Sequence, residues 1–307
     1  MPVTSSIERF TRELPHGITL SCRASGRVGA PLLVFLHGFP EGAFVWDGLL
    51  AHFARPENGG YRCIAPNLRG FEASSSPAEP AAYRAKHLTQ DLLALIASEG
   101  GRADAVIAHD WGGALGWTLA CQPGAPLERL VIINSPHPGP FQRELAGCAA
   151  QQAASAYMNF LARPDAPELL AENDFARLWP FFEKMGAGAE ARGWLTPEVK
   201  EQYREVWRHG LRGGCNYYAT SPLRPPTPDF AGAAGVKLDD AAITVRVPAL
   251  VLWALDDLAL PPSLIDGLDR WVPQMTLETI ADATHWVVHE RPEWLAERIG
   301  RYLREGR

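Results

Sequence analysis

Short apolar runs alternate with amphipathic stretches along the first half of the chain and again near its end. The runs are four to six residues long and mostly end at Gly, Pro or polar residues, which predicts strands buried on both faces. Alternation of such strands with helices predicts βαβ units and a mostly parallel sheet. We expect such strands at residues 32–36, 61–65, 105–108 and 130–133, and the alternation resumes near the end of the chain with strands at 249–253 and 275–280.

Two further patterns refine this outline. Residues 18–22 alternate between apolar and polar side chains, which indicates an edge strand. Residues 262–271 and 292–303 have the spacing of helices that accompany the last strands.

The stretch from residue 138 to residue 244 breaks the alternation. It contains no convincing strand, is rich in aromatic residues, and has helical patterns over 149–161 and 197–211. We therefore predict a core domain made of residues 1–137 and 245–307, interrupted by a helical cap domain over 138–244. The cap is expected above the carboxyl edge of the sheet, where open α/β sheets place their sites.

Composition excludes several classes of protein. The net charge of −6 and the scattered arginines give no basic field for nucleic acid or an anionic membrane surface. No apolar run approaches the roughly 20 residues that span a bilayer, and the first residues lack the pattern of a signal peptide. Five widely spaced cysteines without a C-x-x-C motif favour reduced thiols. We expect a cytoplasmic protein.

The strongest chemical signal is Ala108-His109-Asp110-Trp111-Gly112-Gly113, which follows a predicted strand and opens a predicted helix. This is the setting of a nucleophile elbow, small-x-nucleophile-x-Gly, with aspartate in place of serine. An aspartate carboxylate can attack an sp³ carbon that carries a leaving group and form an alkyl ester, which water then cleaves. We expect His109 to pack behind this bend, at the substrate pocket.

A second motif, His37-Gly38-Phe39-Pro40-Glu41, follows the first buried strand. With the elbow and a late histidine, it resembles the α/β-hydrolase superfamily, in particular its epoxide hydrolase and haloalkane or haloacetate dehalogenase branch. The resemblance implies the α/β-hydrolase fold: a mostly parallel sheet flanked by helices, with an inserted helical cap. It also implies an oxyanion hole from the backbone N–H groups of Phe39 and Trp111, and a cis bond before Pro40. His37 and Pro40 are expected at the substrate pocket.

The third signal is Thr284-His285-Trp286, after the last predicted strand. The order nucleophile, acid, histidine is that of α/β-hydrolases, so His285 is the expected base that activates water. In the families that this chain resembles, the charge partner is the fourth residue of a Gly-x-x-Asp-like turn. Ala254-Leu255-Asp256-Asp257 matches with alanine for glycine, so the resemblance implies Asp257, with Asp256 as the alternative. Trp286 is expected at the substrate pocket.

Two tyrosines of the predicted cap are candidates to donate a proton to the leaving group. Tyr157 and Tyr218 resemble the ring-opening tyrosine pair of epoxide hydrolases, because Tyr218 ends the Asn-aromatic-Tyr sequence Asn216-Tyr217-Tyr218. A phenol O–H can donate a proton to the oxygen of an opening epoxide. Tyr217, expected at the substrate pocket, takes the place of Tyr218 if the register differs by one residue.

The sequence leaves alternatives open. A dehalogenase would use the same Asp110 and His285, with Trp111 as a donor to the halide. The arginines that hold a haloacetate carboxylate are absent, since Trp111 and Ala114 occupy those positions. A non-catalytic binding protein is disfavoured by the Asp110–His285 pair.

The sequence also leads to expectations about substrate, cofactors and partners. We expect a small, apolar or moderately polar epoxide or organohalide as substrate. No metal or organic cofactor is implied, because no His/Cys cluster or phosphate loop occurs. No nucleic acid or membrane partner is expected, and a homodimer stays open.

Overall fold

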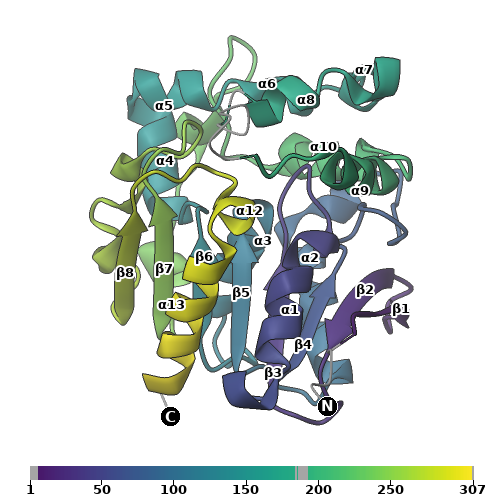
Figure 1. Cartoon of the computed structure of the whole chain (residues 1–307). Coiled ribbons are helices and arrows are strands. Elements are labelled where there is room, and N and C mark those ends of the chain that lie inside the picture. The colour runs from purple at the N-terminus through teal and green to yellow at the C-terminus, as the bar shows by residue number, and fades with distance from the viewer. Residues whose placement is uncertain (1–5, 184, 186–192, 306–307) are drawn as a thin grey trace.

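The computed structural model describes residues 6–183, 185 and 193–305. An eight-stranded sheet forms its centre, in the order β1-β2-β4-β3-β5-β6-β7-β8 (Figure 1). β2 runs antiparallel to β1 and β4, and all other neighbouring pairs are parallel. The mostly parallel sheet predicted from the apolar runs is therefore confirmed. The strands are β1 (Glu8–Glu13), β2 (Thr19–Ser25), β3 (Leu32–Leu36), β4 (Arg62–Pro66), β5 (Ala105–His109), β6 (Leu130–Ile133), β7 (Ala249–Ala254) and β8 (Met275–Ile280).

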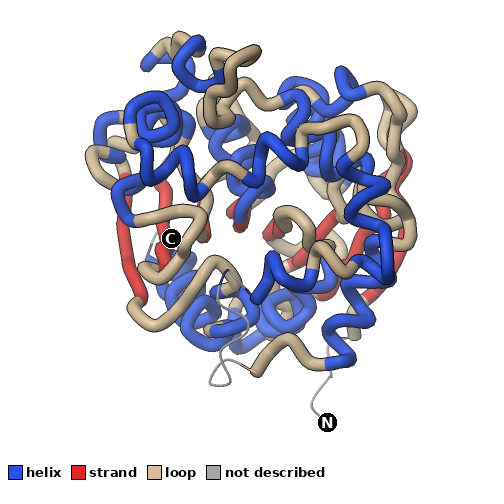
Figure 2. The backbone as a smooth tube through the Cα atoms, turned by 90° about the horizontal axis from the view of Figure 1, so that it is seen from above, coloured by secondary structure: helices blue, strands red, loops and turns tan. Residues whose placement is uncertain are grey.

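Helices cover both faces of this sheet, as the view from above shows (Figure 2). Alternate residues of β3 enter two separate hydrophobic clusters: Leu33 and Phe35 join one, and Leu32, Val34 and Leu36 join the other. Burial on both faces explains why the strand reads as a continuous apolar run. The flanking helices are α1 (Asp47–Phe53) and α13 (Pro292–Glu305) on one face, and α2 (Ala85–Ser98) and α3 (Asp110–Ala120) on the other.

The chain between β6 and β7 is a helical segment, called the cap segment here (residues 138–244). It lies above the sheet in Figure 1. Its helices include α4 (Pro138–Gly147), α5 (Ala149–Ala154), α6 (Tyr157–Leu161), α7 (Ala166–Phe175), α8 (Trp179–Phe182), α9 (Pro197–Trp207), α10 (Arg212–Thr220) and α11 (Asp240–Ile243). Whether it is a domain with the boundaries predicted above stays a prediction.

The structure corrects three expectations about single elements. β2 is not an edge strand, because β1 pairs along its outer side. β1 has the mostly polar and exposed sequence ERFTRE, which is typical of an edge and gives no apolar run. The helix expected over 149–161 is divided at Ser155, whose hydroxyl accepts a hydrogen bond from Gln151 at 2.8 Å.

The third correction concerns residues 262–271. They form two short 3₁₀ turns, Pro262–Ile265 and Leu268–Arg270, in place of one helix. Gly267 lies between the turns with φ +70°, a left-handed conformation that ends a helix and that glycine adopts without a steric penalty. The remaining short helix, α12 (Val287–Glu290), precedes α13.

The five cysteines are free thiols, and all but Cys148 are buried. Within the described ranges, no helix combines the length and the apolar character that a membrane span needs.

Candidate active site

Asp110 stands at the sharp bend between β5 and α3, with a positive φ of 50°. Few residues other than glycine tolerate this conformation, and aspartate is among those that do. Two glycines let the bend pack closely. A Cβ on Gly112 would lie 2.4 Å from the carbonyl oxygen of Leu36, and one on Gly113 would lie 2.3 Å from the Cβ of Ser135. The local sequence therefore builds the bend expected of a nucleophile elbow.

His285 and Asp257 form a buried pair beside this bend. Nδ1 of His285 lies 2.7 Å from Oδ2 of Asp257. The Asp257 carboxylate also accepts hydrogen bonds from Asn134 Nδ2 and from the backbone N–H groups of Ala259 and Leu260, which fix its position. Of the two acids considered, the structure thus places Asp257 against the imidazole, whereas the neighbouring Asp256 is exposed.

The other nitrogen of this imidazole faces the bend. Nε2 of His285 lies 3.8 Å from Oδ2 of Asp110. Burial alone would lower the pKa of His285, but the negative charges of Asp257 and Asp110 and the hydrogen bond to Asp257 raise that pKa to about 9. In the resting protein the ring is therefore an imidazolium at neutral pH.

The loop after β3 supplies a donor to the same carboxylate. The backbone N–H of Phe39 donates to Oδ1 of Asp110 at 2.8 Å. A Cβ on Gly38 would lie 2.2 Å from that oxygen, so only glycine leaves room for this approach. The Phe39–Pro40 peptide bond is cis, as expected. No hydrogen bond from the backbone N–H of Trp111 to the carboxylate occurs among the described residues, so this second donor stays a prediction.

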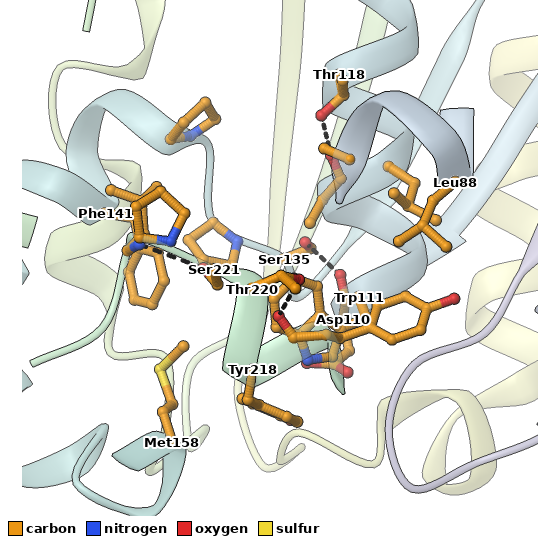
Figure 3. Close-up of a pocket in the computed structure, with 18 of the residues that line it drawn as sticks. Leu88, Asp110, Trp111, Thr118, Ser135, Phe141, Met158, Tyr218, Thr220 and Ser221 are labelled. Atoms are coloured by element: carbon orange, nitrogen blue, oxygen red, sulfur yellow. Dashed lines mark hydrogen bonds between the residues drawn. The ribbon is translucent and has the colours of Figure 1, made fainter. Parts of the chain in front are cut away.

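A cavity of about 390 Å³ opens beside Asp110 and extends between α3 and the cap segment. Figure 3 shows Asp110 and Trp111 near its centre, Tyr218 next to them, and Met158 and Phe141 to one side. The volume is in the range of sites that bind small molecules. A second cavity of about 270 Å³ is lined by Phe39, Tyr157, Phe160, Leu161, Leu170, Arg177, Leu178 and Phe181.

Tyr157 and Tyr218 both line the first cavity, together with Asp110. Their ring centroids lie 6.1 Å apart, and the ring of Tyr218 meets the indole of Trp111 edge-on at 5.1 Å. Burial, and then the negative charge of Asp110, raise the pKa of Tyr157, and burial likewise raises the pKa of Tyr218. Both phenols are therefore protonated and available as donors.

Tyr217 has a different place. It lines the cavity, but its hydroxyl donates to the backbone carbonyl of Arg69 at 3.0 Å. Its helix, α10, touches the core closely, since a Cβ on Gly213 would lie 2.3 Å from the Cα of Gly70. Tyr217 thus ties α10 to the core, whereas Tyr218 lines the cavity near enough to Asp110 for that carboxylate to act on its pKa.

Four residues expected at the substrate pocket line neither of these cavities: His37, Pro40, His109 and Trp286. Each is enclosed by protein instead. His37 accepts the backbone N–H of Leu68 through Nε2, and burial lowers its pKa to about 4, so the ring is neutral. Trp286 is fully buried and donates to the carbonyl of Phe182. These side chains shape the loops behind the site.

A buried polar cluster behind the site has no counterpart in the sequence predictions. Glu41 accepts hydrogen bonds from His109 Nδ1 at 3.1 Å, from Tyr203 of α9 at 2.9 Å and from His289 at 3.2 Å. Burial alone would raise the pKa of the Glu41 carboxyl, but the hydrogen bonds from His109 and His289 hold that pKa well below its ordinary value. The only sequence signal was the position of Glu41 at the end of the His-Gly-x-Pro loop. Asn134, which holds Asp257, was missed as well.

The side chains around the site offer no metal centre. Among the described residues, no group of three or more His, Cys, Asp or Glu side chains is placed to hold a metal ion. The arrangement of carboxylate, imidazole and phenols supports nucleophilic and acid–base chemistry by the protein's own groups.

Comparison with known proteins gives consistent relatives. The family described as alpha/beta hydrolase fold matches residues 31–292. The AB hydrolase superfamily protein YfhM of Bacillus subtilis is 32% identical over 94% of this chain and 96% of its own length. Epoxide hydrolase 3 of Xenopus tropicalis is 31% identical over 96% of this chain and 77% of its own length.

Solved structures agree with the sequence relatives. One, described as a novel epoxide hydrolase of the alpha/beta hydrolases superfamily from metagenomes of hot environments, is 33% identical to this chain. It superposes with a TM-score of 0.84 and covers 97% of this chain and 99% of its own. The chain belongs to the α/β-hydrolase family, in the branch of the epoxide hydrolases, and is an enzyme of that branch.

Proposed function

We propose that this enzyme opens an epoxide to a vicinal diol through an alkyl ester on Asp110. One juxtaposition carries the proposal: the Asp110 carboxylate lies 3.8 Å from the imidazole of His285 and lines the same cavity as Tyr157 and Tyr218. The relatives named as epoxide hydrolases support it.

In the first step, Oδ2 of Asp110 attacks one oxirane carbon, and the bond from that carbon to the ring oxygen breaks. The ring oxygen takes a proton from Tyr157 or Tyr218. Because an alkoxide is a stronger base than a phenolate, a phenol with a raised pKa still protonates it. The products of this step are an alkyl ester on Asp110 and one tyrosinate.

Formation of the ester lowers the pKa of His285. Asp110 loses its negative charge, so one of the two carboxylates that raise the pKa of His285 disappears and that pKa falls. The imidazolium proton neutralises the tyrosinate. The neutral ring then accepts a proton from a water that attacks Cγ of Asp110.

Hydrolysis places negative charge on an oxygen that the protein already holds. The ester forms at Oδ2, so the oxyanion develops on Oδ1, which accepts the Phe39 N–H at 2.8 Å. When the tetrahedral intermediate collapses, the bond from Cγ to the alkyl oxygen breaks. The alkoxide takes the proton of His285, and the new carboxylic acid returns a proton to the ring, which restores the resting state.

The two cap-segment tyrosines favour an epoxide over an organohalide. A halide leaves as a stable anion and needs no proton, whereas an epoxide oxygen needs one, and two phenols line the cavity that holds the nucleophile, near enough for the charge of Asp110 to raise the pKa of both. The first cavity is lined mainly by apolar and aromatic residues, which suits a small, largely apolar substrate.

Covalent trapping tests the proposal. We expect the His285→Gln variant, incubated with styrene oxide, to accumulate one adduct on the peptide containing Asp110, detected by mass spectrometry. The Asp110→Asn variant is the matched control and should give no adduct. In a single turnover of the wild type in heavy-oxygen water, the label should enter the Asp110 peptide and not the diol.

Two results would count against this reaction. A labelled diol in the single turnover would show direct attack by water on the epoxide. Halide release from haloalkanes, without turnover of any epoxide, would assign the same residues to a dehalogenase.

A further inference from the structure

We propose that Arg84 selects epoxides that carry an anionic group, such as a carboxylate, at the end remote from the ring. The inference rests on the proposed function and adds the class of substrate. Two charged residues line the first cavity within the described part of the chain, Asp110 and Arg84. The rest of the lining is apolar, aromatic or neutral.

The cavity follows one face of α3 away from the nucleophile. Residues 110, 111, 114, 115 and 118 all line it, a spacing that places them on one side of a helix. From Asp110 to Thr118 the helix rises by about 12 Å. Figure 3 shows Thr118 and Leu88 on the side of the cavity away from Met158. A linear apolar chain attached to the reacting carbon therefore has room along this face.

Arg84 is the residue immediately before α2 and lines the first cavity. Ala85 and Leu88 of the first turn of α2 line the cavity together with Arg84. No hydrogen bond or ion pair of the Arg84 guanidinium occurs among the described residues, and the first turn of α2 carries no acidic side chain. The positive charge is therefore not neutralised by the protein.

The second cavity provides a contrast. It is also lined by one arginine, Arg177, but that guanidinium lies 3.6 Å from the carboxylate of Glu172. Asp110 does not line this cavity. Of the two arginines, Arg84 alone combines a free charge with a cavity that reaches the nucleophile.

An exposed arginine recognises a carboxylate with modest strength. Pairs of exposed charges contribute up to about 1 kcal/mol, which corresponds to about fivefold in affinity or in kcat/KM. Because Arg84 is exposed, the interaction is screened by salt. Arg84 therefore acts on the choice of substrate and takes no part in the chemistry at Asp110.

The test compares two substrates that differ only at the remote end: the terminal epoxide of undecylenic acid and that of the corresponding amide. We expect the wild type to prefer the acid in kcat/KM, and the preference to shrink at high ionic strength. Arg84→Gln should lower kcat/KM for the acid by up to about fivefold and leave that for the amide unchanged. Lys86→Gln, which removes a neighbouring exposed charge outside the cavity lining, should change neither.

The outcomes separate this inference from the proposed function. If the amide is hydrolysed and the ratio of the two kcat/KM values is the same in wild type and Arg84→Gln, the inference is wrong and the function stands. Equal losses on both substrates would also overturn it, since they indicate a structural role. If neither epoxide is hydrolysed and styrene oxide gives no adduct on Asp110 in the His285→Gln variant, the proposed function is wrong, and the inference that rests on it is wrong as well.

Discussion

Nε2 of His109 lies 2.9 Å from the backbone carbonyl oxygen of His285. The other nitrogen, Nδ1, faces a carboxylate oxygen of Glu41. Both partners are hydrogen-bond acceptors, so the ring of His109 bridges the Glu41 carboxylate and the backbone of His285. Through this one buried ring, the loop after β3 is connected to the backbone of the residue proposed as the base.

The Glu41–His109 pair should contribute to stability. Glu41→Gln removes the buried carboxylate that accepts hydrogen bonds from three side chains, so it should lower the free energy of unfolding by about 3 kcal/mol. Urea denaturation of Glu41→Gln, His109→Gln and the double variant measures the coupling. We expect the double variant to lose clearly less than the sum of the single losses. Additive losses would mean that the two side chains act independently.

The register of α10 predicts different effects for two adjacent tyrosines. Tyr218→Phe removes a phenol from the site and should lower kcat for an epoxide by about tenfold or more. Tyr217→Phe removes the hydrogen bond to Arg69, so it should keep its turnover and lose about 1 kcal/mol of stability. Steady-state kinetics and thermal unfolding of both variants check this. The reverse pattern would make Tyr217 the donor.

The contact between α10 and the core should be sensitive to a single methyl group. Gly213→Ala places a Cβ against the backbone of Gly70, so we expect a loss of about 1–3 kcal/mol in stability and reduced turnover, because α10 also carries Tyr218. Gly147→Ala is the control, since a Cβ there meets nothing within 4 Å. Equal stability of the two variants would show that α10 is not held by this contact.

The raised pKa of His285 predicts a pH dependence of stability. Its pKa is about 9 in the folded protein against 6.5 as the ordinary value, so folding favours the protonated ring. This contribution is fully present below about pH 6.5 and is lost as the pH rises through about 9.

Thermal unfolding of wild type and His285→Gln at several pH values measures this effect. Groups that do not interact with His285 cancel in the difference between the two Tm values. We expect the advantage of the wild type over the variant to shrink between pH 6.5 and 9. A constant difference over that range would indicate that the folded-state pKa is not raised.

Much of the fold was predictable because the signals are local. The inner parallel strands are buried on both faces and appear as apolar runs, whereas the edge strand β8 has the mixed sequence MTLETI and is half-buried to exposed. Asp110, Asp257 and His285 each follow a parallel strand closely. Parallel strands bring their carboxyl ends to one edge of the sheet, so three separate motifs could be assembled from the sequence. Their catalytic roles remain proposals that the variants above test.

Other features depend on contacts between distant parts of the chain. The buried polar cluster is built from four separate parts of the chain, which contribute Glu41, His109, Tyr203 and His289. No spacing along the sequence indicates that these residues meet. The same limit applies to two residues that were expected at the substrate pocket. His37 and Trp286 lie next to residues of the site in sequence, but their side chains point into the protein, where neighbouring loops fill the space around them.

The left-handed backbone at Asp110 fixes the position of the side chain independently of its chemical identity. Gly112 and Gly113 make room for the bend, and neither contact involves the carboxylate. The bend can therefore hold different nucleophilic side chains in the same position. A serine hydroxyl at this position would attack acyl carbons, whereas the carboxylate attacks saturated carbons. The identity of residue 110 therefore decides which kind of electrophile the same fold acts on.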